Sequence, residues 1–219
     1  MSTLDTAINS FSDRDYTKST FHCTNYLFNK SKLAFIHLPK TGGSSLHKLL
    51  TKNHYADLFQ NICTEGVHRP ISKKCPPGLY KYFTISRNPI ARVWSYYQMV
   101  LRNGAQYPYN YFASKGLEIF LENCWEVRNL GCRYYSGIIG KEPDSKSFDI
   151  ATKNLKKFLF VIRFNSYEKD LLSFLKSHKI KIDSIPHIRS SQYLEPTKEE
   201  TDLIYSFNRL DVDLFQDYL

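Results

Sequence analysis

The chain has 219 residues, of which 42% are hydrophobic and 23% are charged, as in an ordinary globular domain. This composition excludes a disordered chain, a collagen and a coiled coil. The longest apolar run, residues 158–162, is far shorter than the roughly 18 residues that span a bilayer. Residues 1–15 lack a basic flank followed by an apolar core, so we expect no signal peptide, no membrane span and a cytoplasmic location.

The charge is strongly basic and unevenly distributed. Lys and Arg number 30 against 21 Asp and Glu, which gives a net charge of +9. Residues 195–219 carry seven acids and two bases, so residues 1–194 carry +14. A strongly basic region of this kind favours anionic partners: phosphates, sulfates, nucleic acid or acidic glycans. A solvated, lysine-rich surface is the alternative.

The chain has five cysteines, an odd number, and their spacing includes no CxxC pair and no zinc-binding pattern. They indicate free thiols in a reducing compartment. A disulfide between Cys63 and Cys75 remains the alternative.

Residues 1–30 are polar and predict an N-terminal arm before a single domain at residues 31–219. The apolar run at residues 32–37 predicts a buried strand, and the glycine-containing turn at 38–43 follows it. Ser44 is expected to open a helix with leucines at helical spacing.

A second strand–helix unit is expected from residue 80. Residues 80–86 have strand composition, and Asn88 and Pro89 have the residue types of an N-cap and a first helical position. The predicted apolar face of this helix repeats every 3.6 residues: Ile90, Val93, Trp94, Tyr97 and Leu101.

The rest of the chain continues the alternation. We predict a helix at 115–135, a central strand at 158–162 and a helix at 167–177. Thr197 and Glu200 form a capping box that opens a C-terminal helix. The fold class is therefore α/β, a parallel doubly wound sheet flanked by helices. Ligands of such sheets lie at the carboxyl ends of the strands, which is where Gly43 and Arg87 are placed.

The first turn carries a candidate anion loop, PKTGGSS at residues 39–45. Two glycines permit close approach of a ligand, backbone N–H groups at a helix N-terminus cradle an anion, and hydroxyls add donors. The loop is not a Walker A motif, because its lysine precedes the glycines. The candidate ligand-binding residues are Lys40, Thr41, Gly42, Gly43, Ser44 and Ser45.

The second candidate block is RNPIARVWS at residues 87–95. Asn88, Arg92 and Ser95 have the spacing of one helix face, and Arg87 precedes that face at the end of a strand. A guanidinium fork and a hydroxyl could converge there on a phosphate. Together with the first loop, this block predicts a ligand with two separate anionic ends.

These two blocks resemble those of sulfotransferases that use 3′-phosphoadenosine 5′-phosphosulfate (PAPS), most closely the carbohydrate branch that includes heparan sulfate 2-O-sulfotransferase. The resemblance implies a P-loop-like sulfotransferase fold, transfer of a sulfuryl group to an acceptor hydroxyl, and release of adenosine 3′,5′-bisphosphate (PAP). It assigns the 5′-phosphosulfate to the loop from Lys40 to Ser45, and the 3′-phosphate to Arg87 and Ser95.

Three further blocks support the resemblance. Residues 129–137 are similar to an Asn…Arg…Gly block of the family, and residues 208–215 to its C-terminal helices. Residues 187–191 resemble a loop that closes over the nucleotide, which adds Arg189 and Ser190 to the candidate ligand-binding residues. Arg163 departs from the pattern at the end of the third strand.

The resemblance also suggests the catalytic groups. His68 lies where the family often has its catalytic base, with Glu65 as the fallback, and such a group removes the acceptor proton. Lys40 would stabilise charge on the leaving phosphate oxygen. We expect no metal, because protein donors suffice for a sulfuryl group and no carboxylate resembles a Walker B Asp.

The acceptor is expected to be a glycan or another hydroxyl compound. The aromatic stretch at residues 107–112 could stack on sugar rings or pack as an ordinary loop. Two other functions were weighed against sulfuryl transfer. A nucleotide kinase would need the missing Walker A lysine, and a nucleic-acid-binding module would show a clustered basic motif, so we expect no nucleic acid.

Overall fold

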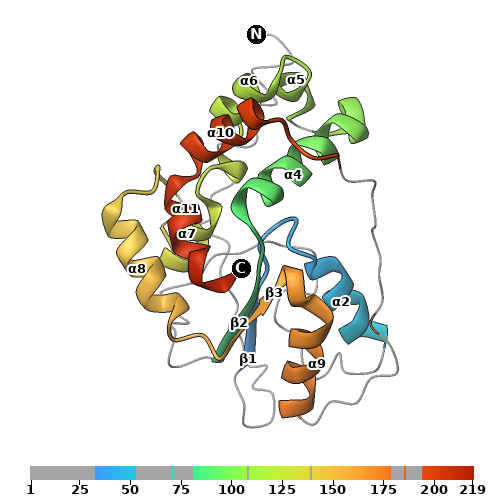
Figure 1. Cartoon of the computed structure of the whole chain (residues 1–219), viewed down its shortest axis with the longest axis vertical. Coiled ribbons are helices and arrows are strands. Elements are labelled where there is room, and N and C mark those ends of the chain that lie inside the picture. Colours follow the sequence, from blue (N-terminus) through green and yellow to red (C-terminus); the bar gives the residue numbers. More distant parts are fainter. Residues whose placement is uncertain are drawn as a thin grey trace.

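The computed structural model describes residues 33–52, 71, 81–107, 109–138, 140–178, 185 and 194–219. Within them lies one parallel sheet with the strand order β1-β2-β3 (Figure 1). The strands are β1 (Leu33–Ile36), β2 (Lys81–Ser86) and β3 (Phe160–Arg163). The predicted α/β class is confirmed, whereas the expected arm at residues 1–30 lies outside the described part.

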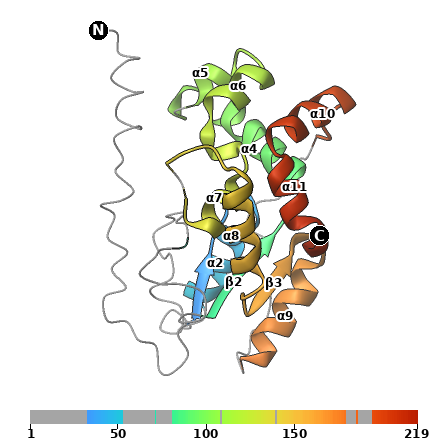
Figure 2. The same cartoon turned by 90° about the vertical axis from the view of Figure 1, so that its left-hand side faces the viewer.

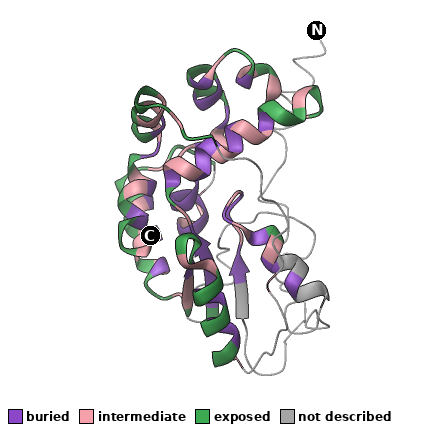
Figure 3. Cartoon of the chain, turned by 45° about the vertical axis from the view of Figure 1, so that its right-hand side comes forward, coloured by how far each residue is buried: buried purple, intermediate pink, exposed green. Residues whose placement is uncertain are grey.

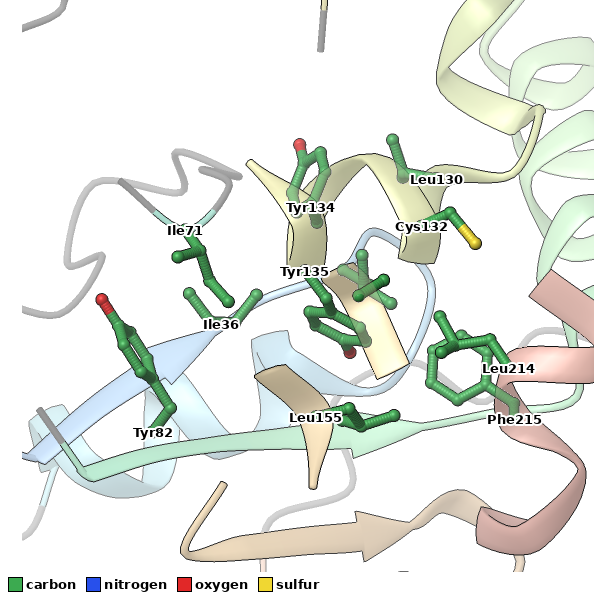
Figure 4. Packing of buried hydrophobic residues seen from close by; sticks show 12 residues of the cluster. Ile36, Ile71, Tyr82, Leu130, Cys132, Tyr134, Tyr135, Leu155, Leu214 and Phe215 are labelled. Atoms are coloured by element: carbon green, nitrogen blue, oxygen red, sulfur yellow. The ribbon is translucent and has the colours of Figure 1, made fainter. Parts of the chain in front are cut away.

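Helices cover both faces of this sheet, as the alternation of side chains along a strand requires. Phe35, Phe83 and Ile162 pack on one face against α2 (Gly43–Lys52) and α9 (Tyr167–Ser177). Ile36 and Tyr82 pack on the other face, in a cluster with residues of α7, α8 and α11 (Figure 4). These three helices are Leu130–Ser136, Ser145–Leu155 and Arg209–Phe215.

β2, rather than β3, is the central strand of the described sheet. All its residues except Lys81 are buried, whereas β3 pairs with β2 alone and Leu159, just before it, is 42% exposed. The prediction of a central strand at 158–162 was therefore wrong. The apolar run at residues 158–162 suggested a longer buried strand. Phe158 is part of that run but precedes β3, and its ring packs on those of Tyr82 and Tyr135.

Helix α4 (Pro89–Asn103) begins as predicted, because the Asn88 side chain accepts hydrogen bonds from the N–H groups of Ile90 and Ala91. The predicted apolar face is only partly right. Val93, Trp94 and Tyr97 are buried, but Leu101 is 37% exposed. The remaining buried positions of the helix are Arg92, Tyr96 and Val100, besides Pro89.

The single helix predicted at 115–135 is three shorter elements: α6 (Leu117–Asn123), the 3₁₀ turn η2 (Trp125–Val127) and α7. The backbone is extended at Cys124 and left-handed at Asn129, with φ of 44°, and either conformation ends a helix. Periodicity alone could not reveal these breaks. The short α5 (Asn110–Ala113) and α8 also had no counterpart in the sequence prediction.

A second helical cluster lies beyond the sheet. It is formed by α4, α5, α6 and α10 (Lys198–Phe207), which gather at the top of Figure 2. The predicted capping box of α10 is present. After α11, the 3₁₀ turn η4 (Gln216–Tyr218) returns to the sheet, where Ser86 Oγ donates to the Tyr218 carbonyl at 2.5 Å. Figure 3, which is coloured by burial, shows buried residues along the strands and on parts of the helices.

Candidate functional site

The turn between β1 and α2 has an unusual backbone. Lys40 adopts a left-handed conformation, with φ of 67°, and Gly42 follows with φ of 89°. The left-handed region disfavours any residue with a side chain, so the surrounding contacts must hold Lys40 there. One such contact is the Thr41 hydroxyl, which is buried and donates to the Leu38 carbonyl at 2.8 Å. This hydroxyl braces the turn, and its predicted contact with an anion stays a prediction.

The turn places the N-terminus of α2 next to the carboxyl end of β1. The N–H groups of Ser45 and Leu46 donate to the Gly42 carbonyl, which therefore accepts the first bonds of the helix. The N–H groups before them have no acceptor within a helix. No acidic residue occupies the first turn, and Ser44 there is exposed. A helix start of this kind favours an anion.

Each glycine of the loop makes room for an aromatic ring of the protein itself. A Cβ atom on Gly43 would lie 2.1 Å from Nε2 of His37, whose ring stacks on Phe35 at 5.3 Å. A Cβ atom on Gly42 would lie 3.3 Å from the Phe164 ring. The glycines were predicted to admit a ligand; in the structure their missing side chains admit these two rings.

Arg87 joins the second candidate block to the first. It follows β2 directly and is half-buried, and its Nη1 donates to the Lys40 carbonyl at 2.7 Å. β1 and β2 are neighbouring parallel strands, so the loop and Arg87 meet at one edge of the sheet. The structure thus brings Arg87 to the loop at Lys40, although 47 residues separate the two in the sequence.

Two residues beside the loop were missed by the sequence analysis. Phe164 begins the 3₁₀ turn η3 (Phe164–Ser166) after β3, and the Arg87 guanidinium lies 4.4 Å from the centre of its ring. The Tyr167 ring also lies near Gly42. Among the described residues the Tyr167 hydroxyl is buried without a hydrogen-bond partner, and burial raises its pKa. The available signal was the position of both residues just after a third parallel strand.

Arg92 is not part of this site. Its side chain is 1% exposed and its Nη2 donates to the Val127 carbonyl at 3.0 Å. Burial lowers the pKa of Arg92, and the charge of the buried Asp211 offsets part of that effect. The expected polar face of Asn88, Arg92 and Ser95 therefore does not form: Asn88 caps its own helix and Arg92 is turned into the protein.

The two supporting blocks at 129–137 and 208–215 contact each other. The Asp211 carboxylate accepts hydrogen bonds from the N–H groups of Gly131 and Cys132, both at 2.8 Å. The Asn129 N–H donates to the side chain of Asn208 at 3.0 Å. These blocks join α7 to α11, so they hold the helical layer together.

Arg163 is directed toward α9. Its backbone N–H, Nε and Nη2 all donate to the Asp170 carboxylate, at 2.8–3.0 Å. Both residues line a groove of about 440 Å³ beside β3, whose other walls come from α8 and η4. Arg163 therefore forms a salt bridge between the end of β3 and α9.

The described residues of the aromatic stretch at 107–112 lead into helix α5, which begins at Asn110. Tyr107 lies 3.2 Å, hydroxyl to hydroxyl, from Tyr96, which in turn donates to Glu126. Tyr111 is 44% exposed and stacks edge-on against Phe112. The stretch follows the C-terminal end of α4, so the length of that helix, roughly 20 Å, separates it from Arg87.

Several predicted residues are not tested by this geometry. His68, Glu65, Arg189 and Ser190 lie outside the described residues, as do Cys63 and Cys75. Ser95 is half-buried on α4, and its contact with a phosphate stays a prediction. Cys124 and Cys132 are buried free thiols, as expected for two of the five cysteines.

No family model matches the chain, and no curated protein is significantly similar to it. Within the described part, no helix is long and apolar enough to cross a membrane. The same residues contain no group of three or more His, Cys, Asp or Glu side chains arranged to hold a metal ion.

Proposed function

We propose that the protein is a PAPS-dependent sulfotransferase with a P-loop-like fold. One observation carries the proposal: the Arg87 guanidinium donates to the Lys40 carbonyl at 2.7 Å, at the carboxyl ends of two neighbouring parallel strands. Two segments chosen from the sequence as the binding sites for two anionic ends thus lie side by side. The left-handed backbone at Lys40, a residue proposed to be catalytic, adds support, because such strain gathers at functional sites.

The proposed reaction passes the sulfuryl group directly from PAPS to the acceptor. The N–H groups at the start of α2 would bind the 5′-phosphosulfate, and Arg87 with Ser95, Arg189 and Ser190 the remainder of the nucleotide. As the S–O bond breaks, the ammonium group of Lys40 stabilises the charge on the leaving phosphate oxygen. His68 takes the proton of the acceptor hydroxyl.

A thermal-shift comparison tests the nucleotide site without knowledge of the acceptor. PAP has anions at both ends of the nucleoside, whereas AMP has one. At about 100 times Kd a ligand adds ~2.7 kcal/mol of stability. At ~2–4 °C per kcal/mol, PAP should raise Tm by roughly 5–10 °C without Mg²⁺. AMP should do far less at equal concentration.

Two arginines of the same region provide matched variants. Arg87→Ala should remove most of the difference between PAP and AMP, while Arg102→Ala, at the exposed far end of α4, should preserve it. A shift with PAP no larger than with AMP would refute the proposal. A shift with ATP and Mg²⁺ would indicate a kinase, and one with oligonucleotides a nucleic-acid-binding module.

The proposed base has its own test. His68→Ala should lower the turnover rate by about 10²–10⁴ with little change in PAP affinity. An unchanged rate would transfer the role to Glu65 or another residue. A screen of glycans, lipids and phenols with labelled PAPS would then identify the acceptor.

A further inference from the structure

The Phe164 ring connects segments that are far apart in the sequence. One contact is with Gly42, where an added Cβ atom would lie 3.3 Å from Cε2 of the ring. A second is with Arg87, whose guanidinium carbon lies 4.4 Å from the ring centre. The ring is 36% exposed, so it lies at the surface of the site and not deep in the core.

The Arg87 guanidinium is consequently held from two directions. The Lys40 carbonyl accepts a hydrogen bond from Nη1, and the Phe164 ring lies within cation–π distance. An arginine side chain has many rotamers, and fixing it on ligand binding opposes affinity. A side chain that is already fixed before the ligand arrives avoids that loss.

We propose that Phe164 is a positioning residue that holds Arg87 in the orientation needed to bind the 3′-phosphate of PAPS. This inference rests on the proposed function, which assigns that phosphate to Arg87. Phe164 acts through the guanidinium and touches no reacting atom. The role belongs to the aromatic ring, because an aliphatic side chain of similar size offers no π-face to a cation.

Affinity for PAP, measured by calorimetry, tests the proposal. Phe164→Leu should weaken PAP binding about 3–10-fold, the range expected for one partly buried cation–π contact. Phe164→Tyr keeps the ring and should stay within about twofold of the wild type. AMP has no 3′-phosphate, so its affinity should change less than twofold in Phe164→Leu. Tyr205→Leu, which removes a ring of similar exposure (40%) on α10, is the control and should change neither affinity.

A double-mutant cycle with Arg87→Ala decides between positioning and a merely structural role. If Phe164 acts through Arg87, Phe164→Leu should have little further effect on PAP affinity in the Arg87→Ala background. Equal losses for PAP and AMP, or additive losses in the cycle, would overturn the inference. Phe164→Met serves the same comparison if the leucine variant fails to fold. A wild-type protein that does not bind PAP would instead refute the proposed function itself.

Discussion

Arg87 and Arg92 come from the same short segment but lie in two different regions of the molecule. Arg87 is half-buried at the carboxyl end of β2, beside a strained loop and a surface ring. Arg92, little more than one helical turn later, is 1% exposed between α4 and the other helices. The first region includes a helix N-terminus. The second includes the buried Asp211 carboxylate, whose charge offsets part of the cost of burying Arg92.

The difference shows how one basic motif can serve binding and stability together. A cation at the open edge of the sheet can meet an incoming anion. A cation in the interior must be compensated within the protein, since an isolated buried charge is very unfavourable. Of the two arginines in the motif R-x-x-x-x-R, Arg87 lies at the open edge of the sheet and Arg92 is buried, so Arg87 is the one that we propose to bind the ligand.

The largest expected effect concerns the interior region. Arg92→Met removes a buried positive charge that lowers the pKa of the buried Asp211 carboxyl, a pKa that burial itself raises. The variant loses the hydrogen bond to the Val127 carbonyl and the charge that offsets part of the burial cost of Asp211, so the free energy of unfolding should fall by about 3–5 kcal/mol. Denaturant unfolding measures the loss. PAP affinity, measured below the unfolding transition, should remain near that of the wild type.

Two comparisons sharpen this test. Arg102→Ala, on an exposed turn of the same helix, should change stability by no more than about 0.5 kcal/mol. If Arg92→Met stays folded but loses PAP affinity, Arg92 binds the ligand after all, and the division between the two regions fails.

The next effect concerns the loop region, where Lys40 combines charge with a strained backbone. Lys40→Ala and Lys40→Gly both remove the ammonium group, so each should lower kcat by about 10²–10³. The glycine variant relieves the left-handed conformation and should be more stable than the alanine variant by about 1 kcal/mol. Steady-state kinetics and thermal unfolding measure the two effects separately. Lys81→Ala, at the amino end of β2, is the control, and near-normal turnover in either Lys40 variant would contradict the proposed role.

A smaller effect tests why the loop needs its second glycine. In Gly43→Ala the new methyl group would meet the His37 ring at 2.1 Å, and such overpacking costs about 1–3 kcal/mol. Adding His37→Ala should restore much of the stability. Gly140→Ala is the matched control, because a Cβ atom there meets nothing within 4 Å. If Gly43→Ala is as stable as Gly140→Ala but loses PAP affinity, the glycine serves the ligand directly.

The sequence predicted local features of the fold better than the contacts between them. The cap at Asn88, the capping box at Thr197 and the start of α2 depend on neighbouring residues, so their patterns were sufficient. The direction of Arg92 depends on its hydrogen bond to the Val127 carbonyl, 35 residues away, and no local pattern encodes that contact. Periodicity could not show the left-handed Asn129, which separates the 3₁₀ turn η2 from α7.

The candidate site was predictable to a similar extent. Glycines, serines and a lysine after a strand indicated the loop, and an arginine after the next strand indicated its partner. The role of Phe164 depends on which strand neighbours β2, because that topology brings the residues after β3 to Gly42 and Arg87. Without the strand order, an aromatic residue after a strand has no special meaning.

The smallest expected effect concerns Arg163, the last residue of β3, whose register partner on β2 is Ser86, the residue before Arg87. Its hydrogen bonds hold the pKa of Asp170 below the ordinary value of about 3.9. A lowered carboxyl pKa stabilises the protein above that value, and the contribution is lost as the pH falls through the folded-state pKa. Asp170→Asn should therefore lower stability at pH 7, and its difference from the wild type should shrink below about pH 4. Arg163→Gln should show the same pH dependence and leave PAP affinity unchanged, as expected of an arginine already bound to a carboxylate. A loss of PAP affinity in Arg163→Gln would place this third arginine with Arg87 at the ligand rather than with Arg92 in the framework.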